Sequence, residues 1–290
     1  MVNPQSFCIF CDNSDLSKEH IMPQWLQAIA GASSDETNYV TRQYIEGFHG
    51  LPPRRAQYQK TRSGDFLTRK ARVVCRQCNN GWMGRLEEKV KPVVSALVLG
   101  EHRVLSVEDQ ADLAAWICLK TIVMEFFQVK HSDRPLQIAI HEEDRKYLRI
   151  HRRPPDNWRI VLAHNRGVKW NSHYGHFRIP LVFGNVVLAS GEVMHVPMAA
   201  AGRPNTQSTT FGLGSMVFYN ISTSLKWLKT YSKGDEKAHG LFTIWPSNME
   251  LLVWPTSPAL TDKAIDELAV SIEHKLRGIG ALVPRSGFGT

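Results

Sequence analysis

Residues 18–25 read KEHIMPQW and residues 74–82 read VCRQCNNGW, and these two stretches set the frame for the first hundred residues. The first stretch holds a carboxylate next to an imidazole, at Glu19 and His20, followed by a proline at position 23. The second contains a Cys-x-x-Cys pair that is followed at once by two asparagines, and an earlier Cys-x-x-Cys pair precedes both stretches. This order predicts a folded unit that is closed by cysteines and carries reactive polar side chains between them.

The two cysteine pairs are Cys8 with Cys11 and Cys75 with Cys78. A structural zinc ion takes four ligands in a tetrahedron, and two thiolates three residues apart supply half of that set. Because the chain has no other Cys pair, each pair must complete the site of the other. Residues 12–74 lie between them, so a folded segment must occupy this loop. The sequence therefore predicts one structural zinc ion, and the alternative is two unrelated reduced turns.

This combination resembles the HNH endonucleases of the His-Me finger group, in the version whose ends are clamped by a four-cysteine zinc site. The resemblance covers residues 1–100. It implies a treble-clef-like ββα-metal module at the N-terminus, with a strand that carries Glu19 and His20, a second strand at 71–74, and a helix from Asn79 to about Gly100. The function that it implies is hydrolysis of phosphodiester bonds in nucleic acid.

The resemblance also implies the roles of single residues. His20 would be the general base, and Glu19 and Asn79 would bind a catalytic Mg²⁺ or Mn²⁺ ion, because both ions prefer oxygen ligands. Asn80 is the alternative ligand if the helix begins one residue later. Trp82 stands where the family often has a basic residue, so a phosphate contact is expected from Arg85 or from the basic stretch described next.

The chain has 290 residues, a formal net charge of +8 and a pI near 9.3, which favours polyanionic partners. Residues 51–76 hold eight basic side chains and one acidic one. This excess indicates a nucleic-acid contact surface, and the alternative is a solvated face. The resemblance favours DNA over RNA as the partner. The residues expected to contact nucleic acid are Arg54, Arg55, Lys60, Arg62, Arg69, Lys70, Arg72 and Arg85.

The fold class expected for the whole chain is α+β, with the nuclease module at 1–100 and a second α+β domain of unknown role at 101–290. Residues 106–130 and 262–277 show the apolar periodicity of helices. The second domain is expected to hold a largely antiparallel sheet. Its expected strands are 136–140, 158–164, 180–189, 216–221, 241–245 and 251–254.

Other patterns are weaker or absent. His173 and His176 form a His-x-x-His pair in an apparent loop, which is a minor metal-site hypothesis. A basic cluster at 145–153 fits an extended nucleic-acid track or an exposed helix face equally well. No phosphate-binding glycine loop, nucleophile elbow or dinucleotide fingerprint is present.

The expected location is cytoplasmic, because the chain shows no signal-peptide pattern and no apolar run of membrane-spanning length. A protein partner or a homodimer is left open. Two functional alternatives to the nuclease are kept. One is a non-catalytic nucleic-acid-binding zinc module, and the other is a protein-interaction scaffold.

Overall fold

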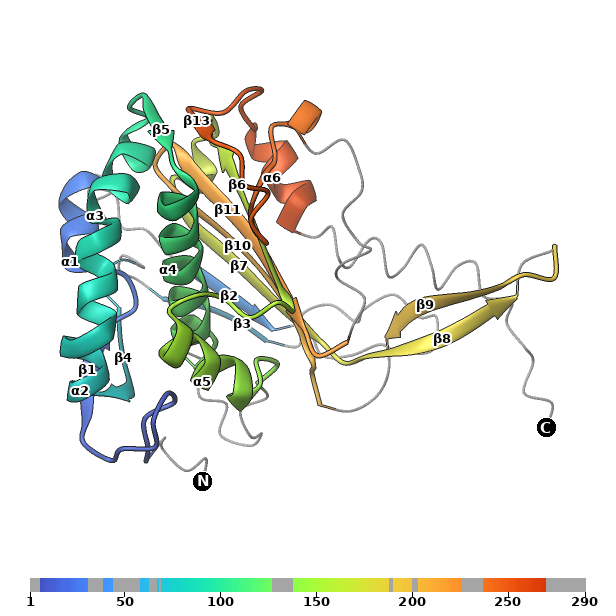
Figure 1. Cartoon of the computed structure of the whole chain (residues 1–290), viewed down its shortest axis with the longest axis horizontal. Helices are drawn as coiled ribbons and strands as arrows, with labels where there is room; N and C mark the ends of the chain where they lie inside the picture. The colour runs from blue at the N-terminus through green and yellow to red at the C-terminus, as the bar shows by residue number, and fades with distance from the viewer. Residues whose placement is uncertain are drawn as a thin grey trace.

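The computed structural model describes residues 6–30, 39–43, 58–62, 67, 69–126, 138–187, 190–199, 203–225 and 237–269. It has mixed helix and strand content, and every sheet is antiparallel. The expected α+β class is confirmed at this level. Figure 1 shows a central sheet with long helices across one face and a hairpin that projects from the body.

The elements follow one another along the chain in this order. The first half contains β1 (Leu16–His20), α1 (Gln24–Ile29), β2 (Tyr39–Gln43), β3 (Tyr58–Arg62), β4 (Lys70–Cys75), α2 (Arg76–Cys78), the π-type turn η2 (Asn79–Met83), α3 (Gly84–Leu99), β5 (Arg103–Leu105) and α4 (Val107–Phe126). The second half contains α5 (Glu142–His151), β6 (Trp158–His164), η3 (Lys169–Asn171), β7 (Ser172–Ile179), β8 (Leu181–Val187), β9 (Val193–Ala199), β10 (Thr206–Leu213), β11 (Met216–Thr223), η4 (Lys237–His239), β12 (Phe242–Trp245), β13 (Leu252–Trp254) and α6 (Asp262–Ala269).

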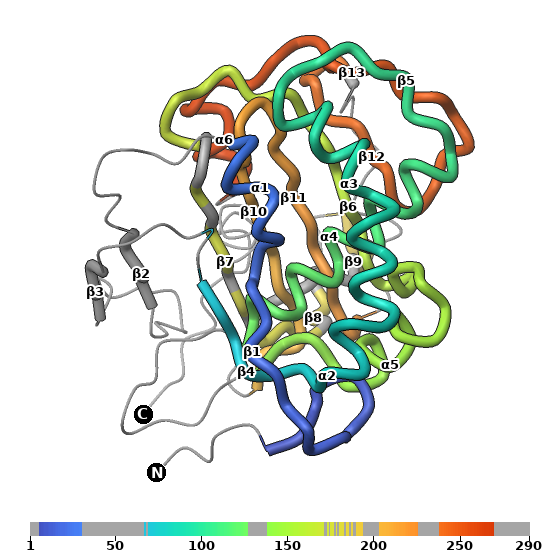
Figure 2. The backbone as a smooth tube through the Cα atoms, turned by 90° about the vertical axis from the view of Figure 1, so that its left-hand side faces the viewer, coloured from blue at the N-terminus to red at the C-terminus, as the bar shows by residue number. Residues whose placement is uncertain are grey.

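Two strands that are far apart in sequence form the frame of the N-terminal part. β1 pairs with β4 in antiparallel register, and this register sets Glu19 opposite Ala71 and His20 opposite Lys70. Figure 2 shows these strands side by side, with α2 at the end of β4. The chain then continues without a break through α2 and η2 into α3. Both strands were expected from the sequence, and both are present.

The helix after β4 begins earlier than the sequence suggested. We expected its start at Asn79, but α2 begins at Arg76, inside the second cysteine pair. The Cys75 sulfur explains the early start, because it accepts a hydrogen bond from the backbone N–H of Cys78 at 3.4 Å and so caps the helix. A kink with non-helical dihedral angles at Gly81 separates this first turn from the regular α3.

Helix α4 lies between the N-terminal strand pair and the five-stranded sheet. Ser106 and Asp109 exchange hydrogen bonds of 3.0 Å at its start and so cap the helix. Most of its residues from Leu113 to Glu125 are buried, which is typical of a helix covered on all sides. One cluster of buried apolar residues runs from Cys8 to Trp254 through this helix. The division of the chain into two domains at residue 100 stays a prediction.

The main sheet has the strand order β12-β6-β11-β10-β7. One face packs against α4, and the opposite face packs Ala163 and Val217 against Ile265 of α6. Five of the six expected strands are present as β6, β8, β11, β12 and β13, with ends that differ by a few residues. Residues 138–140 are irregular instead of extended, because the backbone N–H groups of Ala139 and Ile140 bind the Glu125 carboxylate.

In the second half of the chain, strands β7, β9 and β10 were not expected from the sequence. His173 and His176 therefore lie in β7 and not in a loop. Residues three apart in a strand project from opposite faces, so these two imidazoles cannot share one metal ion. Within the described ranges, no helix is both long enough and apolar enough to span a lipid bilayer.

Candidate functional site

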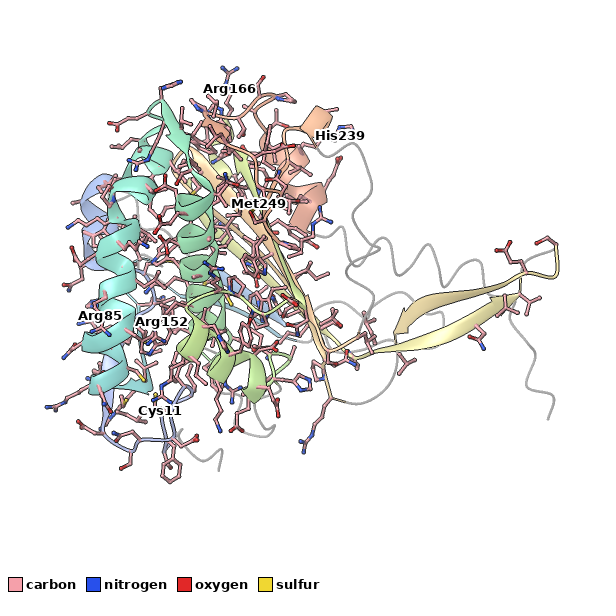
Figure 3. The ribbon with its side chains drawn as sticks, in the orientation of Figure 1. Cys11, Arg85, Arg152, Arg166, His239 and Met249 are labelled. Atoms are coloured by element: carbon pink, nitrogen blue, oxygen red, sulfur yellow. The ribbon has the colours of Figure 1, made fainter. Side chains whose placement is uncertain are left out.

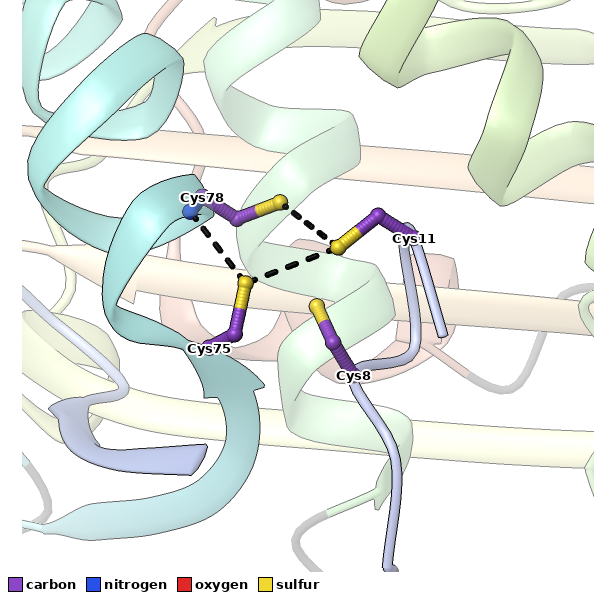
Figure 4. A group of neighbouring side chains, drawn as sticks. All are labelled: Cys8, Cys11, Cys75 and Cys78. Atoms are coloured by element: carbon purple, nitrogen blue, oxygen red, sulfur yellow. Dashed lines mark hydrogen bonds between the residues drawn. The ribbon is translucent and has the colours of Figure 1, made fainter. Parts of the chain in front are cut away.

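The four cysteines of the two pairs meet in one cluster, as Figure 4 shows. Their sulfur atoms all lie within 4.8 Å of one another, and the Cys11 sulfur lies 3.5 Å from those of Cys75 and Cys78. Zinc–sulfur bonds of about 2.3 Å in a tetrahedron place the sulfurs about 3.8 Å apart. All four side chains are free thiols. The cluster could therefore hold a metal ion such as zinc.

Local backbone geometry explains why the first pair forms a tight turn. The N–H of Asp12 donates to the carbonyl of Cys8 at 3.0 Å, and Asp12 adopts a φ of 61° that aspartate tolerates better than most residues. The N–H of Ile9 then donates to the carbonyl of Val73 at 3.0 Å. This bond fixes the first turn to β4, which ends at the second pair.

The thiols also differ in acidity. A hydrogen bond from Cys78 is the main cause that lowers the pKa of the Cys8 thiol to about 5. The same hydrogen bond, together with burial, raises the pKa of Cys78 above its ordinary value. Zinc binds thiolates, and Cys8 is already biased towards that form.

Helix α5, from the second half of the chain, forms hydrogen bonds with the turn that carries the first cysteine pair. Arg145 Nε donates to the Ile9 carbonyl at 2.9 Å, and Arg149 donates to the Phe10 carbonyl at 3.5 Å. Arg152 lies 4.7 Å from the centre of the Trp82 ring, and Figure 3 shows it near Arg85. The first part of the basic cluster at 145–153 thus lies on α5, which ends at His151, and two of its arginines bind backbone carbonyls.

The residues proposed from the sequence as ligands for the catalytic ion come together at the β1–β4 pair. Glu19 is buried, and its side chain forms a hydrogen bond with Asn79. Asn79 also donates from Nδ2 to the hydroxyl of Ser17 at 3.3 Å. Ser17 and Glu19 of β1 therefore contact the same side chain, that of Asn79. Asn80, the alternative ligand, is exposed.

His20 is the last residue of β1 and is partly buried. Its Nε2 lies 3.2 Å from the Gln24 amide nitrogen, at the first residue of α1. Burial lowers the pKa of His20, and the positive charges of Lys70 and Lys120 act in the same direction. This shift favours the neutral imidazole, which is the form that accepts a proton.

Two charged residues at this place were missed by the sequence reasoning. Lys120 of α4 is fully buried, and its ammonium group pairs with the Glu87 carboxylate of α3. The same ammonium lies 4.0 Å from Glu19 Oε1. Burial raises the pKa of Glu19, and Lys120 opposes this shift. A lysine inside a mostly apolar helix was the available signal, but the sequence does not show which acid it meets.

The basic residues expected at the nucleic-acid surface are only partly placed. Lys70 and Arg72 are exposed on β4, Arg85 is exposed on α3, and Arg69 precedes β4 with partial burial. Lys60 and Arg62 lie in β3. Arg54 and Arg55 lie outside the described residues.

Together, the β1–β4 register and the start of the following helices bring residues 19, 20 and 79 to one place and the four cysteines to another. Lys70 and Arg72 flank the first place on β4. Comparison of the chain with protein-family models, with curated proteins and with solved structures finds no match.

Proposed function

We propose that this protein is a divalent-metal-dependent endonuclease of the HNH type that hydrolyses phosphodiester bonds, in DNA rather than RNA. The observation that carries this proposal is the meeting of Glu19 and His20, at the end of β1, with Asn79 after the second cysteine pair. In this proposal β1, β4 and the helix that follows are the ββα-metal module. The four thiols hold a structural zinc ion that fixes its two ends.

The donor groups at this place suit a hard cation. Glu19 offers a carboxylate and Asn79 an amide oxygen, and oxygen ligands of this kind bind Mg²⁺ or Mn²⁺. The amide of Asn79 can present either its nitrogen or its oxygen towards Glu19, because the two orientations have nearly the same shape. The bound ion would stabilise charge on the scissile phosphate and on the leaving oxygen.

His20 supplies the base in this proposal. Glu19 and not His20 binds the ion in this proposal, so the imidazole stays free to accept a proton from the attacking water. The contact with Gln24 restrains the orientation of the ring. A positioned base of this kind contributes about 10²- to 10⁴-fold to the rate.

The test is plasmid and single-strand cleavage in Mg²⁺ or Mn²⁺, with and without chelator, for the wild type and His20→Ala. We expect His20→Ala to lower the cleavage rate by about 10²- to 10⁴-fold, with zinc content and nucleic-acid binding unchanged. His239→Ala is the matched control, because His239 is an exposed histidine in η4. Wild-type cleavage by His20→Ala would refute the assignment.

One observation favours a second candidate, a non-catalytic nucleic-acid-binding zinc module. Lys120 lies within ion-pair distance of Glu19, as it would if this carboxylate served only to balance a buried charge. This candidate predicts salt-dependent binding to nucleic acid without cleavage of either substrate in Mg²⁺ or Mn²⁺. The cleavage assay above therefore separates the two functions.

A further inference from the structure

The buried ammonium group of Lys120 joins three elements at the proposed site. Lys120 lies on α4, outside residues 1–100, and its side chain has no exposed surface. It pairs with Glu87 on α3 and lies 4.0 Å from Glu19 on β1. A buried charge needs partners of opposite charge, and here one of the partners is the proposed ligand for the catalytic ion.

We propose that Lys120 is a positioning residue that holds the Glu19 carboxylate beside Asn79 and weakens binding of the divalent ion when no substrate phosphate is present. This inference rests on the proposed function. It assigns to the chain beyond residue 100 a direct part in the site, because α4 delivers the ammonium group.

The positioning role follows from the contacts of Glu19. Its carboxylate lies between two groups, the Asn79 amide and the Lys120 ammonium. The side chain of Glu87, the other partner of Lys120, is 17% exposed. Glu87 thus fixes the ammonium from one side, and the ammonium in turn restrains Glu19. Loss of Lys120 would leave two carboxylates to repel each other.

The effect on ion binding follows from the charges. Glu19, Glu87 and Lys120 carry one net negative charge, and a divalent ion would change this to one net positive charge. A site with net positive charge attracts the negative phosphodiester. Without Lys120 the same two carboxylates would attract the free ion more strongly and would be neutral once it bound. At separations of a few ångströms, one unit charge changes ion affinity on the order of tenfold or more.

The experiment measures Mn²⁺ binding by calorimetry on the zinc-loaded full chain, and cleavage in parallel. Glu19→Gln identifies the Mn²⁺ signal that belongs to this site. We expect Lys120→Met to bind Mn²⁺ at least about tenfold more tightly and to cleave at least about tenfold more slowly at saturating Mn²⁺. Lys120→Arg, which keeps the charge, is expected to restore part of the rate.

Lys89→Met is the matched control. Lys89 also connects α3 to α4, through Asp112 at 2.7 Å and Glu108 at 2.9 Å, but its side chain is 53% exposed. We expect its Mn²⁺ affinity and cleavage rate to equal those of the wild type. A purely structural role for Lys120 predicts the same result for Lys120→Met once its zinc content is normal.

The double variant Lys120→Met with Glu87→Gln covers the case in which Lys120→Met fails to fold. It removes one charge of each sign, so we expect Mn²⁺ affinity near that of the wild type and cleavage still at least about tenfold slower. Unchanged or weaker Mn²⁺ binding in folded Lys120→Met, wild-type cleavage in the double variant, or no Mn²⁺ signal sensitive to Glu19→Gln would each overturn the proposal. A wild type that binds Mn²⁺ here without cleaving refutes the nuclease alone, and the affinity comparison still applies.

Discussion

Helix α4 carries two buried polar clusters, and they differ in how their charges are balanced. The site cluster is Lys120 with Glu19 and Glu87, where an ammonium meets carboxylates whose side chains are 10% and 17% exposed. The sheet cluster begins one residue later, at Thr121, and extends into the main sheet. The carboxylates of the site cluster keep some exposed surface, whereas the side chains of Thr121, Gln207 and Asn220 in the sheet cluster have none.

The sheet cluster is a chain of neutral hydrogen bonds. Asn220 Nδ2 donates to Thr121 Oγ1 at 3.0 Å, and Gln207 Nε2 donates to Asn220 Oδ1 at 3.0 Å. Thr209 Oγ1 then donates to Gln207 Oε1 at 2.7 Å and lies 2.7 Å from His176 Nδ1. These buried hydrogen bonds join α4 to the sheet through specific partners and so make the packing of the two specific.

Glu125 closes the sheet cluster one helical turn after Thr121. Its carboxylate accepts hydrogen bonds from the N–H groups of Ala139 at 2.6 Å and Ile140 at 3.1 Å. Burial raises the pKa of Glu125 to about 7 and lowers that of His176 to about 3. Both shifts favour the neutral form.

Loss of zinc should produce the largest difference in stability between the two clusters. The reason is that only the site cluster depends on the cysteines for its position. We expect Cys75→Ser to lower the free energy of unfolding by more than about 4 kcal/mol, the range in which loss of a metal site falls. Hydrogen exchange measured by mass spectrometry should rise over residues 7–30 and 69–100. The strands β6, β10 and β11 should keep most of their protection.

Cys118→Ala is the control for this experiment, because Cys118 is buried on α4 and lies outside the cysteine cluster. It should keep one zinc ion per chain. Zinc-free protein from a purification without chelator would contradict the zinc assignment. Equal loss of protection in both regions would instead show that the two clusters depend on each other.

The two clusters also show what the sequence could predict. Cysteine spacing and the adjacent Glu19 and His20 located the site cluster in part, because these signals are local. Lys120 could not be assigned, since its partners lie 33 and 101 positions away. β10 was missed because its sequence, TQSTTFGL, is mostly polar although every residue is buried. Thr206 and Gln207 form hydrogen bonds with side chains of β11, and Thr209 contacts His176 of β7. Hydropathy does not record such partners.

Urea unfolding at a series of pH values measures how the titratable groups of the sheet cluster, Glu125 and His176, contribute to the free energy of unfolding. The pKa of Glu125 rises from 4.5 to about 7 on folding, so its contribution to stability is present below pH 4.5 and is lost as the pH rises through 7. The pKa of His176 falls from 6.5 to about 3, so its contribution is present above pH 6.5 and is lost as the pH falls through 3. Between pH 4.5 and 6.5, a rise in pH decreases the contribution of Glu125 to stability and increases that of His176, so the two effects oppose each other.

Single substitutions should separate the pH dependence of stability that comes from Glu125 from that of His176. Relative to the wild type at each pH, Glu125→Gln should gain stability as the pH rises from 5 to 7, by up to about 1.4 kcal/mol per pH unit. His176→Asn, which keeps a polar atom near Nδ1, should show a slope of the opposite sign between pH 5 and 6.5. Taking the difference from the wild type cancels the contribution of the cysteine site. A flat difference for both variants would show that neither group changes its pKa on folding.

The smallest expected effect concerns the surface beside the site cluster. Arg72 is exposed on β4, two residues from Lys70, which pairs with His20 in the strand register. If this side meets the phosphates, Arg72→Ala should leave the cleavage rate at saturating substrate nearly unchanged. It should reduce the slope of log binding constant against log salt concentration by about one. The measurement is fluorescence anisotropy with a labelled duplex at several salt concentrations, in Ca²⁺ to prevent cleavage.

Arg166→Ala is the matched control, because Arg166 is exposed just after β6 and Figure 3 places it at the opposite end of the molecule from Cys11. Both substitutions remove one positive charge, so any effect of net charge on long-range attraction is the same in the two variants. A local phosphate contact predicts that only Arg72→Ala changes the salt slope. Equal salt slopes of binding for the two variants would mean that nucleic acid is attracted by the overall positive charge alone. Arg72 would then make no phosphate contact of its own.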